Sequence, residues 1–107
     1  MKLLTQEIKL ALPKIYSTDA VSLKDKVVIC KFFTPWSFWT WFVFEGEAEK
    51  SFEDSKEDDY IFFGMVHGFE KEMGYFRLAE LESIRGPGNL LIERDLSIFK
   101  ATYMNCC

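Results

Sequence analysis

Residues 27–44 read VVICKFFTPWSFWTWFVF, and this stretch decides the fold class. Val27–Phe33 is β-branched at its start and Trp39–Phe44 is rich in aromatic residues, which is typical of strands. The TPWS segment between them contains Pro35 and predicts a turn. The stretch therefore predicts a β-hairpin. Its second strand is apolar on both faces, so one face needs a cover beyond the main core, such as a helix or a partner.

The flanking segments predict the rest of an α+β fold. Thr5 caps a short N-terminal helix that Pro13 ends. Tyr60–Phe69 predicts a third strand, in which Gly64 marks a bulge or a close approach of another backbone. A fourth strand and a short helix follow, over Tyr75–Leu78 and Leu78–Ile84. We therefore predict a four-stranded, mainly antiparallel sheet with an N-terminal helix and a short helix after the fourth strand.

The chain length and composition predict one domain. The 107 residues fit a single domain over residues 1–107, and the 17% aromatic content allows a short chain to bury a sizeable core. Residues 100–107 predict a weakly ordered tail. No stretch approaches the roughly 18 apolar residues of a membrane span, and the N-terminus lacks a long apolar segment. We expect a cytoplasmic protein with no membrane association.

Acidic residues are concentrated between the second and third predicted strands. Eight of the 17 carboxylates lie in residues 45–59, against two lysines, although the net charge is only −4. Such a block is typical of a solvated loop. A second interpretation is an acidic surface that meets a basic partner. The candidate partner-binding carboxylates are Glu53, Asp54, Glu57, Asp58 and Asp59.

Few residues suggest catalysis. His67 is the single histidine, and the pattern favours a structural role for it. In an extended segment Glu93 and Asp95 would share a side, but Arg94 stands between them and Arg85 lies upstream, which favours structural ion pairs over acid–base chemistry. Binding by these motif charges is the alternative. The cysteines have no metal-ligand or disulfide spacing. We therefore expect no enzyme activity, no metal and no cofactor.

Aromatic residues around the hairpin turn suggest a binding surface. Alternation along the strand sends Trp39 and Trp41 toward the core and leaves Trp36 or Phe38 exposed at the turn. Exposed aromatic residues are enriched at binding hot spots. Base stacking would also require nearby cations, and locally the sequence offers only Lys31. This pattern favours a protein partner over nucleic acid.

Two motifs dominate the second half of the chain, namely GYFRLAELESIRGP at residues 74–87 and IERDL at residues 92–96. With KFFTP, WTW, FFG and GFE upstream, they resemble the signature of a small domain-of-unknown-function family found on phages, plasmids and conjugative elements of bacteria. The resemblance runs from about Leu4 to Phe99 and departs at the acidic insert and the cysteine-containing tail. It carries over no catalytic residues.

The resemblance implies a function that the residues alone do not name. Relatives of this type include an inhibitor of the RNA-guided nuclease of type II CRISPR systems. The chain is therefore expected to be a non-enzymatic interaction protein, an anti-CRISPR inhibitor whose partner is such a nuclease, in a bacterial cell. The alternative is a nucleic-acid-binding accessory protein of a phage or plasmid.

Overall fold

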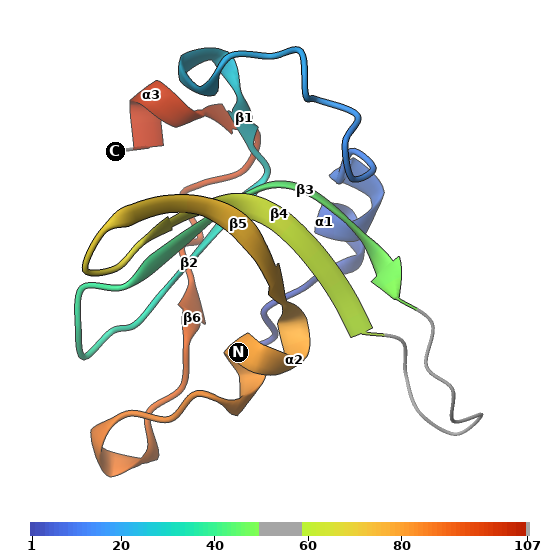
Figure 1. Ribbon diagram of the computed structural model, residues 1–107. Helices are drawn as coiled ribbons and strands as arrows, with labels where there is room; N and C mark the ends of the chain where they lie inside the picture. The colour runs from blue at the N-terminus through green and yellow to red at the C-terminus, as the bar shows by residue number, and fades with distance from the viewer. Residues whose placement is uncertain (50–58, 107) are drawn as a thin grey trace.

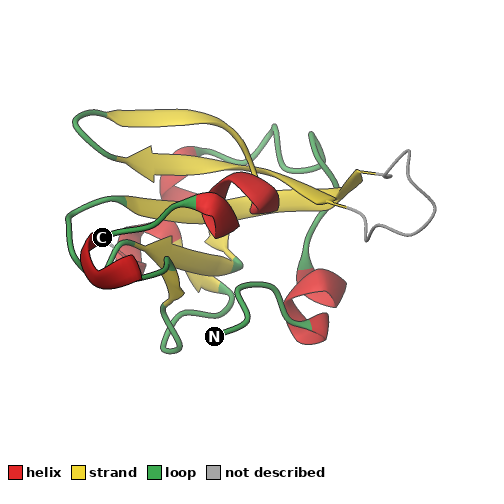
Figure 2. Ribbon diagram, turned by 90° about the horizontal axis from the view of Figure 1, so that it is seen from below, coloured by secondary structure: helices red, strands yellow, loops and turns green. Residues whose placement is uncertain are grey.

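The computed structural model describes residues 1–49 and 59–106, and its centre is a five-stranded antiparallel sheet in the order β5-β4-β3-β2-β6 (Figure 1). The strands of this sheet are β2 (Cys30–Phe33), β3 (Thr40–Glu49), β4 (Asp59–His67), β5 (Lys71–Arg77) and β6 (Glu93–Arg94). A second, two-stranded sheet pairs β1 (Val27–Val28) with β7 (Ala101–Thr102). The α-helices are short (Figure 2): α1 (Gln6–Ala11), α2 (Leu78–Ser83) and α3 (Tyr103–Cys106). The fold is α+β.

Several local predictions are confirmed. The Thr5 hydroxyl accepts a hydrogen bond from the Ile8 backbone N at 3.3 Å, and α1 ends at Ala11, ahead of Pro13. β2 and β3 form the predicted hairpin, and α2 follows β5 directly. Gly64 does allow a close approach, because a Cβ at this position would lie 1.8 Å from the Phe42 carbonyl oxygen.

The predicted strand number was wrong, because the main sheet has a fifth strand. β6 pairs with β2 through Phe32↔Arg94 and Phe33↔Glu93. The Arg94 guanidinium also donates to the carbonyl oxygens of Lys2 and Leu3 at 2.7 and 2.9 Å. Two charged residues carry no strand periodicity, so contacts made in the folded chain define this strand.

One face of the sheet packs against α1, α2 and the N-terminal residues. Phe32, Trp41 and Phe62 supply the sheet side of this core, and Phe32 and Phe62 are fully buried. Leu4 and Ile8 approach from the N-terminal segment, and Leu81 approaches from α2. This face is the main hydrophobic core.

The opposite face packs against the C-terminal segment, where the sequence predicts a weakly ordered tail. The structure differs, because residues 101–106 form β7 and α3 and the Tyr103 side chain is only 7% exposed. Tyr103 packs edge-on against Phe42 and Phe44, at ring-centroid distances of 5.3 and 5.7 Å. The cover that the second strand requires therefore comes from this chain. Cys107 lies outside the described residues.

The acidic segment does not begin as a loop. Glu45, Glu47 and Glu49 lie in β3, and Asp59 begins β4. The register shifts between Val43 and Glu45, and this bulge turns Glu45 to the same side as Phe42. There Glu45 is 1% exposed, and its carboxylate accepts hydrogen bonds from the backbone N of Tyr16 at 2.8 Å and of Thr18 at 3.0 Å.

Candidate binding surface

Three aromatic side chains gather where two turns of the main sheet meet. Phe38 lies in the β2–β3 turn and Phe69 in the β4–β5 turn, and they are 59% and 86% exposed. Their ring centroids are 5.6 Å apart, and Trp39 lies 6.4 Å from Phe38 and 5.5 Å from Phe69. We call Phe38, Trp39 and Phe69 the aromatic tip. Large apolar side chains that cluster on the surface are typical of interaction sites.

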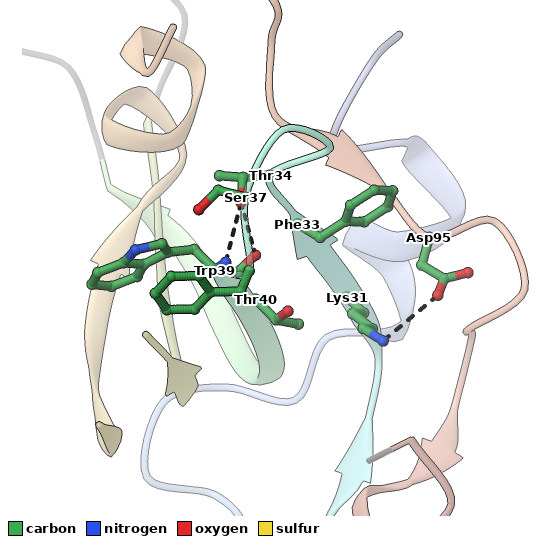
Figure 3. A pocket seen from close by; sticks show the side chains of 8 residues that line it. Lys31, Phe33, Thr34, Ser37, Trp39, Thr40 and Asp95 are labelled. Atoms are coloured by element: carbon green, nitrogen blue, oxygen red, sulfur yellow. Dashed lines mark hydrogen bonds and ion pairs between the residues drawn. The ribbon is translucent and has the colours of Figure 1, made fainter. Parts of the chain in front are cut away.

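Backbone contacts hold the aromatic tip in place. The Thr34 hydroxyl accepts from the Trp39 backbone N at 3.1 Å (Figure 3). The Thr34 backbone N also donates to the Trp39 carbonyl oxygen at 3.0 Å. The turn that carries Phe69 passes close to the Trp39 ring at Gly68. A Cβ at residue 68 would lie 2.3 Å from Trp39 Cζ3, so only glycine fits there. The two turns are therefore packed together before any partner binds.

A shallow pocket of about 250 Å³ adjoins the aromatic tip. Figure 3 shows the Lys31 ammonium pointing toward the Asp95 carboxylate, at 3.8 Å. Hydrogen bonds from the Ser97 side chain and backbone, with a smaller contribution from Lys31, hold the pKa of Asp95 below its ordinary value. The pocket thus offers one cation and one anion among aromatic rings and hydroxyls. Its lining residues are Lys31, Phe33, Thr34, Ser37, Phe38, Trp39, Thr40 and Asp95.

A family model described as a protein of unknown function, DUF2958, matches residues 3–105. The chain belongs to the DUF2958 family. This result confirms the resemblance to a domain of unknown function. The match includes the aromatic tip, the pocket and residues 101–105 of the C-terminal segment that covers β3, so all three belong to the DUF2958 domain. Comparisons with curated proteins and with solved structures returned no match.

Of the two turn residues singled out by the sequence, only Phe38 is strongly exposed in the DUF2958 domain. Trp36 is half-buried against the main core, and its ring lies over Gly86, where a Cβ would come within 2.2 Å of Trp36 Cδ2. Trp36 therefore joins the turn to the RGP motif. Sequence reasoning missed Phe69 as a surface residue. The available signal was its place between Gly68 and Glu70, at the end of a strand.

Three of the four motif charges of the DUF2958 domain, namely Arg85, Arg94 and Asp95, have partners within the fold. Arg85 donates to the carbonyl oxygens of Glu82 and Ile84 at 2.5 and 3.1 Å, at the end of α2. Arg94 holds the N-terminal backbone. Glu93 lies in β6, and only Asp95 reaches the pocket.

Of the five acidic candidates, the structure describes only Asp59. Glu53, Asp54, Glu57 and Asp58 lie outside the described residues. Asp59 is described, and its Oδ1 accepts from the backbone N of Ala79 at 3.1 Å, in the first turn of α2.

His67 lies at the end of β4 and contacts the C-terminal segment. Its Nε2 and the Tyr103 hydroxyl are 2.7 Å apart, which joins β4 to the C-terminal segment. Burial, followed by Lys71 and Lys31, lowers the pKa of His67. Burial raises the pKa of Cys30 to about 12, consistent with a buried apolar role for this thiol. The described residues contain no group of three or more side chains placed to hold a metal, and none of their helices is long and apolar enough to span a membrane.

Proposed function

We propose that this protein is a non-enzymatic interaction protein of a mobile genetic element that binds and inhibits the RNA-guided nuclease of a type II CRISPR system. The observation that carries the proposal is the aromatic tip. Phe38 and Phe69 present large apolar area on a support already held by Thr34 and Gly68. Aromatic anchors on a rigid support favour protein binding, because little side-chain entropy is lost when the partner binds.

The charges near the tip favour protein over nucleic acid. All three arginines already have partners: Arg85 and Arg94 donate to carbonyl oxygens, and Arg77 forms an ion pair with Glu49 at 2.7 Å. In the pocket, Lys31 faces Asp95. Binding of a phosphate backbone depends on several free cations along one surface, and the tip has few.

The choice of nuclease rests on the sequence resemblance and on charge. The guide and target channels of type II effectors are positively charged. The chain carries a net charge of −4, with its carboxylates concentrated between residues 45 and 59. An acidic protein with an aromatic anchor fits a basic protein channel and would be inhibitory if it occupied that channel.

The first experiment is a tagged pull-down of a purified, guide-loaded type II effector, with and without nuclease treatment. We expect the effector to be recovered in both conditions. Recovery that disappears after nuclease treatment would instead favour the nucleic-acid accessory protein. Recovery of neither effector nor nucleic acid would contradict both functions.

Two variants locate the surface in the same assay. Phe38→Ala combined with Phe69→Ala removes the exposed rings of the tip, and recovery should fall. Leu10→Ala is the matched control, because Leu10 is 78% exposed but lies on α1. Recovery that falls equally with both variants would contradict a specific role for the aromatic tip.

A further inference from the structure

β5 forms a long edge of the main sheet. It contains seven residues, and within the described chain its only neighbour in the sheet is β4 (Figure 1). An edge strand presents backbone N–H and C=O groups that can pair with another strand. The opposite edge, β6, contains only two residues, and Arg94 ties it to the N-terminal backbone. The two edges therefore differ in their capacity to accept a further strand.

β5 lacks two of the features that often protect an edge, and its charged residues lie toward its two ends. Its register with β4 runs without a shift from Lys71 to Arg77, and it contains neither a bulge nor a proline. The centre of the strand is uncharged: Met73 and Tyr75 are 40% and 49% exposed, and a Cβ at Gly74 would meet no atom within 4 Å. The middle of the edge is thus open and apolar.

Carboxylates lie near the middle of β5. The pKa of Tyr75 is raised to about 12, first by its hydrogen bond with Tyr16 and burial, and further by the negative charges of Asp19 and Glu45. Tyr16 and Tyr75 also pack edge-on, with ring centroids 6.4 Å apart. Glu45 is buried, and its carboxylate already accepts from the backbone N of Tyr16 and of Thr18. The exposed Asp19 is therefore the carboxylate in this region that a strand placed along the edge could face.

The C-terminal end of β5 is also acidic. The pKa of Arg77 is raised first by its hydrogen bond with Glu49, and smaller contributions come from Glu80 and Asp59. The Arg77–Glu49 ion pair is neutral as a unit, which leaves Glu80 and Asp59 in excess. Lys71 is the one other cation on this strand. The surroundings of the edge are complementary to a basic segment.

We propose that β5 accepts an extended, basic segment of the partner protein as an additional antiparallel strand, with lysine or arginine alternating with apolar residues. The backbone of the segment pairs with β5, its apolar side chains pack beside Met73 and Tyr75, and its cations face the surrounding carboxylates. This inference rests on the proposed protein-binding function and specifies the chemistry of the segment that is bound. β5 begins two residues after Phe69, so the edge continues from the aromatic tip.

The test uses the full chain and a synthetic peptide of alternating lysine and valine, acetyl-KVKVKVK-amide. We expect saturable binding and slower amide hydrogen exchange within residues 71–77. The control is the same peptide with alternate backbone nitrogens methylated. It keeps every charge, but the methylated edge of the peptide cannot donate hydrogen bonds to β5. It should bind about tenfold more weakly because several hydrogen bonds are lost. Equal binding of the two peptides, or no slowing at residues 71–77, would overturn the proposal.

Two variants at one position test the charge argument. The space at Gly74 accepts a side chain, so Gly74→Lys should weaken peptide binding about threefold and Gly74→Glu should not weaken it. A glutamate–valine peptide that binds as well as the lysine peptide would contradict the predicted basic chemistry. A dimer of this protein that already protects residues 71–77 without peptide would overturn the assignment in favour of a second copy. These results are independent of the Phe38 and Phe69 pull-down, so failure of one proposal can be told from failure of the other.

Discussion

Two groups of aromatic side chains in this protein differ in what covers them. Phe42 and Phe44 on β3 are 2% and 1% exposed, because Tyr103 and the rest of the C-terminal segment pack on them. Phe38 and Phe69 are comparable rings at the turns of the same sheet, but they remain 59% and 86% exposed. Aromatic content alone therefore does not separate core from binding surface. The position of the C-terminal segment, which covers one group and not the other, separates core from binding surface.

The largest expected effect is on the covered group. Tyr103→Ala should lower the free energy of unfolding by about 3–5 kcal/mol, because it removes a buried ring that contacts two others. Chemical denaturation measures this change. Met104→Ala is the neighbouring control, since Met104 is 65% exposed, and it should change stability by less than about 0.5 kcal/mol. A similar loss in both variants would mean that the two groups are not distinct.

Substitution of the exposed rings, Phe38 and Phe69, should weaken binding and leave stability nearly unchanged. Phe38→Ala with Phe69→Ala should weaken binding to a guide-loaded type II effector by about 2 kcal/mol or more, which is roughly 30-fold, as at other aromatic hot spots. The free energy of unfolding should change by less than about 1 kcal/mol. Calorimetric titration and denaturation measure the two quantities separately. A variant that unfolds easily but binds normally would reverse the assignment of the two groups.

A substitution at Gly68, which lies beneath the aromatic tip, should have a smaller effect on stability. Gly68→Ala should destabilise the protein by about 1–3 kcal/mol, because the new Cβ would overlap the Trp39 ring. Gly74→Ala is the matched glycine substitution on β5, where a Cβ meets nothing within 4 Å, and it should be neutral or slightly stabilising. Thermal unfolding of the two variants checks this contrast. Equal melting temperatures would show that Trp39 does not need glycine beneath it.

The smallest effect concerns the pH dependence of the cover. His67 has a lowered pKa in the folded state, so the folded protein binds fewer protons at this site than the unfolded chain. The contribution of neutral His67 to the free energy of unfolding is therefore fully present above pH 6.5, the ordinary pKa of histidine. This contribution is lost as the pH falls from 6.5 through the lower pKa of His67 in the folded protein. His67→Gln should remove this part of the acid sensitivity in unfolding curves. An unchanged pH profile would exclude His67 as its origin.

Local signals explain why much of the fold could be predicted from the sequence. Thr5 and Pro13 mark the ends of the first helix through capping chemistry and ring geometry, which act within a few residues. The sequence of residues 27–44 is enough to predict the hairpin. The structure differs only in dividing the first predicted strand at Ile29 into β1 and β2. The strand that was missed, Glu93–Arg94, is paired by contacts distant in sequence, which no local period encodes.

The candidate surface was less accessible to sequence reasoning. Phe38 was identified by its place at a turn, but its partner Phe69 lies 31 residues further along the chain, and only the packing of two turns brings the rings together. The sequence left open whether Trp36 or Phe38 is exposed, and the absence of a side chain at Gly86 makes room for the Trp36 ring. Glu45 resembles the start of a solvated loop until the bulge turns it inward. Each difference depends on a contact between distant segments.

The most direct test of the central claim is a DNA-cleavage assay with a purified, guide-loaded type II effector and increasing amounts of this protein. We predict that the wild-type chain inhibits cleavage, that Leu10→Ala inhibits equally, and that the folded Phe38→Ala, Phe69→Ala variant requires roughly 30-fold more protein for the same inhibition. Undiminished cleavage at saturating wild-type protein would contradict the inhibitor function. Inhibition by the double variant as strong as that of the wild type would contradict the role of the aromatic tip.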